Sequence, residues 1–174
     1  MDIIKLYDLF EKERTIVDYN TITDEIKQTF TQNKEITLAT SYNDRVTSRT
    51  ISFVNKELDI YFMSWEHNKK ITQLSKNPKV ALTLNNIQIE GVAKVLGSPS
   101  KFQEIGDIFR TKFSDRWFET FSKIGEMVLV KVEVKHIVRF ENINRRFYLQ
   151  RVDLENQVVH QMRMEDKTNP QYPY

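Results

Sequence analysis

The chain has 174 residues, 40% of them hydrophobic, and its 26 lysine and arginine residues are nearly balanced by 24 aspartate and glutamate residues. This length and apolar fraction suit one compact globular domain, and the balanced charge argues against a nucleic-acid or anionic-membrane partner. The sequence contains no cysteine, which excludes disulfide bonds, thiolate catalysis and cysteine metal ligands.

Two helical patterns open the chain. Apolar side chains recur at near-helical spacing in residues 2–13 and again in residues 21–30, where Thr23 is the predicted N-cap. The first pattern carries charges every few residues, unlike a secretory signal. No window reaches the roughly 18 apolar residues of a membrane span. We therefore expect a soluble, cytoplasmic protein.

Short runs rich in β-branched and aromatic side chains follow Asn33 and predict strands. These strands are expected at residues 35–42, 46–54, 58–64, 79–84 and 87–96. Asn43-Asp44 and Lys56-Glu57 stand where hairpin turns are expected, so neighbouring strands should pair antiparallel. Between the third and fourth strands, residues 68–76 predict a short helix that ends before Pro78.

The second half of the chain repeats both kinds of pattern. Pro99 begins a helical region whose apolar stripe runs to Phe113 and should pack on a sheet. Residues 127–140 alternate almost perfectly, which predicts a strand with its even-numbered valines in the core and its other face, Leu129 included, in water. A last strand is expected at about 145–152.

About seven mainly antiparallel strands with few helices predict a mainly β fold. A closed or nearly closed β-barrel with flanking helices is the expected form, because closure removes exposed sheet edges. We assign residues 1–155 to this single domain and interpret residues 156–174, which are polar and end in a proline-containing stretch, as a loose C-terminal tail.

Three cations suggest an anion site. Alternation in the strand at 46–54 places Arg49 on the same face as apolar side chains, where a guanidinium needs either an internal partner or an anionic ligand. Lys69 and Lys70 begin the helix after the next strand, where free amides and the helix dipole favour a negative group, although adjacent lysines are often simply solvated. Because these strands are hairpin neighbours, the three cations should converge and would need an anion such as phosphate.

Other side chains have both a structural and a functional interpretation. Ser64 adds a hydroxyl at a strand end, and Asn68 either caps the following helix or donates to a ligand. Trp65 and Trp117 either stack on a ring or pack internally, and packing is the commoner role of an aromatic residue. The three histidines form no metal-binding motif.

Residues 35–97 resemble the FMN-binding split barrel of the pyridoxamine 5′-phosphate oxidase-like superfamily, particularly its short general-stress-protein branch. The features that carry the resemblance are the LAT strand, the SR followed by an apolar pair, the strand that ends in a hydroxyl residue, the helix start with two cations, the NP-VAL link and the EG-A-V strand. The resemblance implies a split barrel of about seven strands. It also implies a homodimer with two flavin sites at the subunit interface.

The resemblance further implies which residues bind FMN. Arg49 matches the arginine on the FMN phosphate, Lys69 and Lys70 match the basic pair at the helix start, and Ser64 and Asn68 complete the phosphate pocket.

Three further positions match the part of the family site that lies along the flavin ring. Thr50 and Ile51 correspond to residues whose backbone follows the isoalloxazine. Asn86 falls where larger members carry a glutamine that reaches the flavin.

Departures from the family pattern limit the activity that can be transferred. Val54 stands where the pyridoxamine phosphate oxidases have a lysine that holds substrate, and residues 139–151 lack their arginine-x-histidine element. We therefore expect an FMN-dependent oxidoreductase of another substrate, with NADH or NADPH as the candidate donor, that does not oxidise vitamin B6.

Three alternatives remain open. One is a non-catalytic flavin-binding stress or sensor protein, and another is a haem-binding split barrel. The third is an oligonucleotide-binding barrel, which would need an extended basic stripe that the sequence lacks.

Overall fold

The computed structural model describes residues 14–164, and its framework is a ten-stranded antiparallel sheet. The helices are α2 (Tyr19–Gln32), α3 (Lys69–Lys76), α4 (Gln103–Lys112) and α5 (Asp115–Ser122), with a 3₁₀ turn η1 (Pro99–Lys101). The strands are β1 (Thr15–Val17), β2 (Glu35–Tyr42), β3 (Arg45–Ser52), β4 (Val54–Lys56), β5 (Asp59–Trp65), β6 (Lys79–Leu84), β7 (Ile87–Gly97), β8 (Met127–Ile143), β9 (Arg146–Asp153) and β10 (Val158–Met164). The helix predicted for residues 2–13 lies outside the described residues. None of the helices in the described range is long and apolar enough to cross a membrane.

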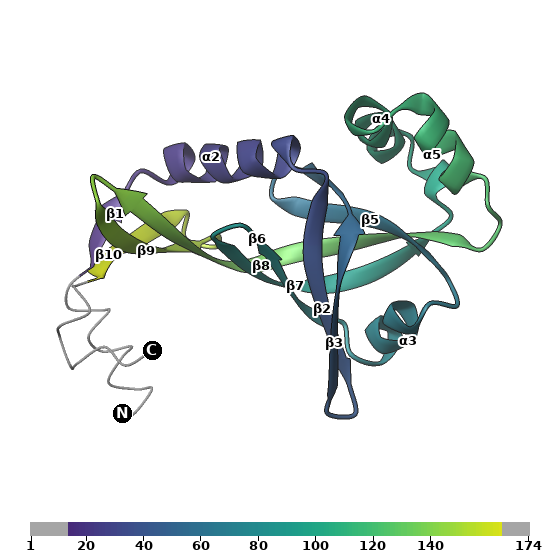
Figure 1. Ribbon diagram of the computed structural model, residues 1–174, viewed down its shortest axis with the longest axis horizontal. Helices are drawn as coiled ribbons and strands as arrows, with labels where there is room; N and C mark the ends of the chain where they lie inside the picture. The colour runs from purple at the N-terminus through teal and green to yellow at the C-terminus, as the bar shows by residue number, and fades with distance from the viewer. Residues whose placement is uncertain (1–13, 165–174) are drawn as a thin grey trace.

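Strand β8 is the central strand of the sheet, because it is long enough to pair with two different strands along one edge. Its first part, from Met127 to Val132, pairs with β5, and its last part, from Ile137 to Ile143, pairs with β9. The opposite edge of β8 pairs with β7, and the order continues through β6 and β2 to β3. Figure 1 shows β8 running along the molecule, with β9, β10 and β1 at one end and β5, α4 and α5 at the other. The prediction of a mainly β, antiparallel fold with flanking helices is confirmed.

The strand count exceeds the predicted seven for three reasons. The expected strand at 46–54 is interrupted at Phe53, whose amide donates to the carbonyl of Lys34, and this divides it into β3 and β4. The short β1 was not predicted. Residues Val158–Met164, which were interpreted as part of a loose tail, form β10, because they pair with both β9 and β1. The tail interpretation was therefore wrong for these residues.

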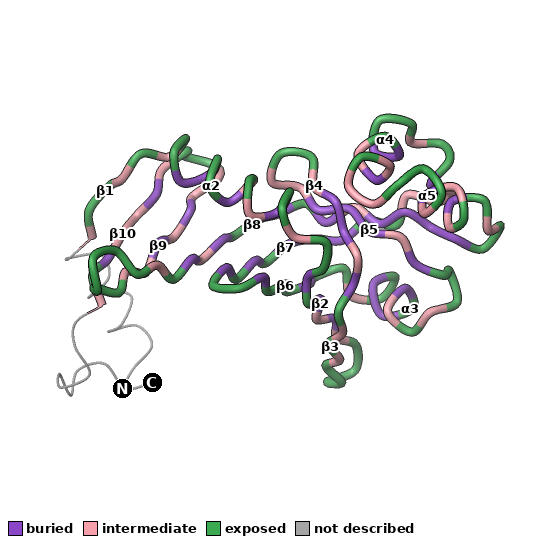
Figure 2. The backbone as a smooth tube through the Cα atoms, turned by 45° about the horizontal axis from the view of Figure 1, so that its top comes forward, coloured by how far each residue is buried: buried purple, intermediate pink, exposed green. Residues whose placement is uncertain are grey.

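The core has two parts on opposite sides of the β5–β8 region. The larger cluster joins α2, through Ile26 and Phe30, to the inward faces of the sheet. The smaller cluster lies under α4 and α5 and includes Phe109, Phe118 and Leu129. Leu129 is only 1% exposed, so the prediction that its face of the strand is wet was wrong there: α4 and α5 cover it. Figure 2 shows this run of β8 as buried.

Two local predictions concern helix starts and turns. Helix α2 begins earlier than predicted, because Asp18 is its N-cap and its carboxylate accepts from the amide of Thr21 at 2.7 Å. Thr23 instead lies inside the helix and donates its hydroxyl to the carbonyl of Tyr19 at 2.8 Å. Asn43 and Asp44 both have positive φ, which confirms the predicted hairpin turn between β2 and β3.

Candidate functional site

Arg49 lies on the inward face of β3, and all of its hydrogen bonds go to uncharged oxygens. Its Nη1 donates to the hydroxyl of Thr40 at 2.7 Å and to the carbonyl of Leu38 at 3.3 Å. Its Nη2 donates to the hydroxyl of Thr47. No carboxylate forms an ion pair with Arg49 within residues 14–164. Burial lowers the pKa of Arg49, as expected for a cation that loses water without gaining an anion.

Lys69 and Lys70 begin α3, but they differ in their surroundings. Lys69 is exposed, whereas Lys70 is half-buried. Burial, and after it the positive charge of Arg49, lowers the pKa of Lys70. Lys70 therefore lies close enough to Arg49 for their charges to repel, so the predicted convergence of strand β3 and helix α3 is present for this pair.

The first turn of α3 also offers free backbone donors. The amides of Ile71 and Thr72 donate to the carbonyl of Asn68, at 2.8 and 3.2 Å. Within the described part of the chain, the amides of Lys69 and Lys70 have no hydrogen-bond partner. Unpaired amides at a helix start, together with the helix dipole, attract anions.

Ser64 and Asn68 lie together at the start of this helix. Asn68 occupies the N-cap position through its backbone, but its side chain caps no helix amide. Its Nδ2 instead donates to the hydroxyl of the buried Ser64 at 3.2 Å, and that hydroxyl donates to the carbonyl of Trp65 at 3.2 Å. The predicted capping role of the Asn68 side chain is therefore absent, and this leaves the lysine amides available.

Thr50 and Ile51 continue β3 directly beyond Arg49. Thr50 is exposed and lies opposite Thr37, while Ile51 is buried in the larger core cluster opposite Ile36. Among the described strands, β3 ends the sheet order and pairs along one edge only, with β2. The backbone that the resemblance places beside a flavin ring thus belongs to an edge strand next to the cations.

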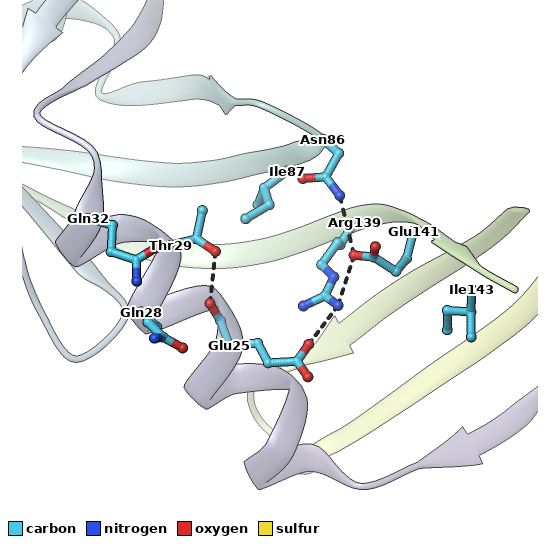
Figure 3. A pocket seen from close by; sticks show the side chains of 9 residues that line it. All are labelled: Glu25, Gln28, Thr29, Gln32, Asn86, Ile87, Arg139, Glu141 and Ile143. Atoms are coloured by element: carbon cyan, nitrogen blue, oxygen red, sulfur yellow. Dashed lines mark hydrogen bonds and ion pairs between the residues drawn. The ribbon is translucent and has the colours of Figure 1, made fainter.

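Asn86 lies elsewhere. It sits in the turn between β6 and β7, and α3 precedes the opposite end of β6. Its side chain donates to the carbonyl of Phe140, and it lines a cavity of about 520 Å³ between α2 and β8 (Figure 3). In that cavity Arg139 forms ion pairs with Glu25 at 2.7 Å and Glu141 at 2.9 Å. A single chain therefore does not bring Asn86 to the Arg49 site.

A buried residue that was not predicted from the sequence joins the two halves of the site. Gln73, on α3, is 4% exposed, and its Oε1 accepts from the hydroxyls of Thr40 at 2.7 Å and Thr47 at 2.9 Å. Its Nε2 donates to the carbonyl of Arg45 at 3.3 Å. The one available signal was its spacing, three residues after Lys70, which places both side chains on one side of the helix.

The two tryptophans are distinguished by their packing. Trp117 stacks on Phe113 with ring centroids 4.4 Å apart and contacts Phe121 at 4.8 Å, so its interpretation as a packing residue is confirmed. Trp65 ends β5, close before α3, and is 43% exposed. Its flat ring is available to a ligand or to a partner surface.

A family model described as pyridoxamine 5′-phosphate oxidase matches residues 22–139. No curated protein matches the chain. Among solved structures, General Stress Protein 26 from Bacillus anthracis str. Sterne is 22% identical with a TM-score of 0.51, over 65% of this chain and 92% of its own.

Two further solved structures share the fold. A pyridoxamine 5′-phosphate oxidase-related, FMN-binding protein from Nostoc punctiforme PCC 73102 is 12% identical, with a TM-score of 0.59, over 87% of this chain and 100% of its own. HutZ, the haem storage protein from Vibrio cholerae, is 15% identical, with a TM-score of 0.56, over 64% of this chain and 88% of its own. At these low sequence identities, the structural likeness shows a common fold alone. The predicted split barrel is thereby confirmed. The family model spans more than half of the residues of this chain, so the chain belongs to the pyridoxamine 5′-phosphate oxidase family.

Proposed function

We propose that the protein binds FMN through its phosphate at the Arg49–Lys70 site and acts as an FMN-dependent oxidoreductase on a substrate other than vitamin B6. One observation carries the proposal: Arg49 and Lys70 are both partly buried, lie close enough for their charges to repel, and have no carboxylate partner within residues 14–164. Two such charges repel each other, and each loses hydration free energy on burial. A bound phosphate would offset both costs.

The donor set fits a phosphate monoester better than a diester. Arg49, Lys69 and Lys70 supply three positive charges, and the amides of Lys69 and Lys70 supply two further donors. A monoester carries about −1.5 to −2 charges at neutral pH and three terminal acceptor oxygens. In a dinucleotide the two phosphates are joined by an anhydride oxygen and each is esterified once, so each has less charge and fewer terminal oxygens than a monoester, and the site favours FMN over FAD.

In this proposal, FMN and the protein chain have different roles. FMN supplies hydride and electron transfer when it is bound. The chain supplies the charge that holds the phosphate, through Arg49 and the start of α3, and an edge strand at Thr50 and Ile51 beside which a ring can lie. The FMN-binding relative from Nostoc punctiforme supports a flavin as the ligand.

A vitamin B6 substrate is not part of the proposal. Val54 is fully buried in the smaller core cluster, with Phe109 and Leu129 as fellow members. An apolar side chain packed in this way has no donor to offer a substrate phosphate. The substrate must therefore be recognised by other groups.

We further propose a homodimer with a flavin site at each end of the interface. Val92 on β7 and Phe140 on β8 keep exposures of 37% and 36%. Apolar side chains of this kind on neighbouring strands are suited to burial against a second copy. Sedimentation equilibrium should then give twice the chain mass, and a monomer that still binds FMN tightly would contradict the interface site.

The test of the cofactor is a titration of flavin-free protein with FMN, preceded by the absorption spectrum of the protein as purified. We expect saturable binding and a flavin spectrum, and a colourless protein that does not bind FMN would overturn the proposal. Arg49→Ala or Lys69→Ala should weaken binding by about tenfold to a hundredfold, because one charge-assisted phosphate contact contributes about 1.5–3 kcal/mol. Lys76→Ala, at the other end of α3, is the matched control.

The test of turnover is reduction of the bound flavin. Stopped-flow mixing with NADH or NADPH should bleach the oxidised absorbance, with a nicotinamide nucleotide as the proposed donor. An oxidised spectrum that persists with both donors would favour the non-catalytic flavin-binding stress or sensor protein.

Haem binding is the second candidate, favoured by the common fold with HutZ. An axial ligand would have to come from His67, His136 or His160, and the first two are exposed. His160 is half-buried, and its Nδ1 has no hydrogen-bond partner among residues 14–164. A Soret band on haem titration that His160→Ala removes would support this candidate, and an unchanged band would remove that residue from it.

A further inference from the structure

We propose that Gln73 is the positioning residue of the anion site: its neutral side chain holds Arg49 in place and leaves the positive charge of Arg49 free for the ligand. The inference rests on the proposed binding of a phosphate at Arg49 and Lys70. It adds a residue that touches no ligand and acts through Arg49.

The hydrogen-bond directions around Gln73 are determined by chemistry. The carbonyl of Arg45 can only accept, so the atom 3.3 Å from it is the Nε2 of Gln73. The remaining amide atom is Oε1, which has no hydrogen, so the hydroxyls of Thr40 and Thr47 must donate to it. Gln73 thereby fixes the direction of both hydroxyl protons.

Because both hydroxyl protons point to Gln73, Arg49 can form only one consistent set of hydrogen bonds with the two threonines. Each threonine hydroxyl has a single hydrogen, and Gln73 takes it, so only the lone pairs of the oxygen face the guanidinium. Arg49 has donors only, and it uses Nη1 on Thr40 and Nη2 on Thr47. Without Gln73, either hydroxyl could turn its proton toward Arg49 and weaken the contact.

The neutrality of Gln73 matters as much as its geometry. A carboxylate at this position could accept the same two hydroxyl protons, and proteins commonly hold a buried arginine with a carboxylate. Such a group would neutralise the charge that attracts the phosphate. The amide accepts the same two protons with no net charge, and its Nε2 also donates to the carbonyl of Arg45, so Arg49 and Lys70 keep their combined attraction for an anion.

Gln73 also sets the relative position of the two halves of the site. It belongs to α3, which carries Lys69 and Lys70, and it bonds to Thr40 on β2 and to Thr47 on β3, the strand of Arg49. A further bond to the sheet, from Asn77 directly after α3 to the hydroxyl of Ser41 at 3.0 Å, involves neither threonine. The link from the lysine helix to Arg49 therefore passes through Gln73.

The experiment compares FMN with riboflavin, which lacks the phosphate, on flavin-free full-length protein. The variants are Gln73→Met, which removes the anchor, and Gln73→Glu, which keeps the acceptors but adds a charge; Ser75→Ala on the same helix is the control. We expect FMN affinity to fall about tenfold for Gln73→Met and about a hundredfold for Gln73→Glu. Riboflavin affinity should stay within about threefold of the wild type in each.

The outcomes separate this inference from the proposed function. If the wild type does not bind FMN, the proposed function fails and the inference with it. If the wild type binds FMN, then equal losses for FMN and riboflavin, or unchanged FMN binding by Gln73→Glu, overturn the inference alone.

Should both Gln73 variants fail to fold, Thr47→Val removes one ordered hydroxyl at a partly exposed site. It should weaken FMN binding about threefold to tenfold and spare riboflavin, and equal losses for the two ligands would overturn the inference.

Discussion

Replacing Lys70 with methionine should make the flavin-free protein more stable and its complex with FMN less stable. The ammonium group of Lys70 is half-buried near Arg49 and has no acceptor within residues 14–164. Methionine keeps most of the aliphatic length and removes the charge. Relief of this repulsion and desolvation at a partly exposed site should increase the free energy of unfolding by about 0.5–1 kcal/mol.

The pH dependence of this effect has a definite sign. The pKa of Lys70 is lower in the folded protein than in the unfolded chain, so the unfolded chain binds more protons between the two pKa values. The destabilisation by charged Lys70 is therefore fully present at neutral pH. It diminishes as the pH rises through the folded-state pKa toward the unfolded value of about 10.4. The stability advantage of Lys70→Met should diminish over the same range.

Adding FMN should reverse the order of stability. Loss of a charge-assisted contact weakens binding by about tenfold to a hundredfold. At an FMN concentration of 100 times the wild-type Kd, binding stabilises the wild type by about 2.7 kcal/mol. The same concentration would stabilise the variant by only about 1.4 kcal/mol after a tenfold loss, or about 0.4 kcal/mol after a hundredfold loss.

Urea unfolding followed by far-ultraviolet circular dichroism, with and without FMN, measures both effects on the same samples. Lys76→Met is the matched control, because Lys76 is exposed in the last turn of α3, where a cation favours the helix dipole. The control should be slightly less stable than the wild type in both conditions. A Lys70→Met protein that is destabilised without FMN, or that gains as much from FMN as the wild type does, would refute the assignment of Lys70 to an anion site.

Two further predictions concern the scaffold. Burial lowers the pKa of Lys112 to about 8, so the stability of the wild type relative to Lys112→Met should rise between about pH 8 and pH 10.4. Because the side chain is only half-buried, solvent screening limits the rise to about 1–2 kcal/mol, and urea unfolding at pH 7, 9 and 10 would measure it. Gly91→Ala would place a Cβ 2.7 Å from the carbonyl oxygen of Glu133 and 2.7 Å from Cγ1 of Val132. It should lower the free energy of unfolding by about 1–3 kcal/mol in the same assay, and an unchanged value would contradict the tight contact between β7 and β8.

The features that could be predicted from the sequence are those set by local chemistry. The predicted bounds of β2 and β6 agree with the structure residue for residue, because alternation and flanking turn residues define them. Helix α3 begins at Lys69, directly after the polar Asn68, and the two lysines are its first residues, as predicted. Arg49, Lys69 and Lys70 were predicted to converge because the strands before α3 are hairpin neighbours, which restricts where α3 can begin.

The features that were missed depend on contacts between distant parts of the chain. Leu129 is buried by α4 and α5, which no pattern within β8 can reveal. Strand β10 has mixed polar and apolar residues and becomes a strand through its pairing with β9 and β1. Gln73 bonds to Thr40, which is 33 residues away in the sequence, so its role is visible only once β2 and α3 are packed together.

Three partly buried cations elsewhere in the described residues have surroundings that differ from those of Arg49 and Lys70. Two pair with carboxylates: Lys131 pairs with Asp59 at 2.7 Å, and Arg139 pairs with Glu25 at the same distance. Lys112 has no carboxylate partner in the described residues, but it donates to the carbonyl of Phe30 at 2.8 Å near the C-terminal end of α2.

The Arg49–Lys70 pair differs because the two cations lie close enough to repel and the neutral groups around Arg49 are already ordered. With 24 acidic residues in the chain, a carboxylate partner was available in principle. An uncompensated pair lowers the stability of the free protein, and such a cost is typical of a site whose missing partner is a ligand. The part of the large core cluster that lies under α2, around Ile26 and Phe30, supplies apolar burial that can offset this cost away from Arg49 and Lys70. A substitution that stabilises the free protein at Arg49 or Lys70 should therefore weaken binding, whereas one that stabilises the core should leave binding unchanged.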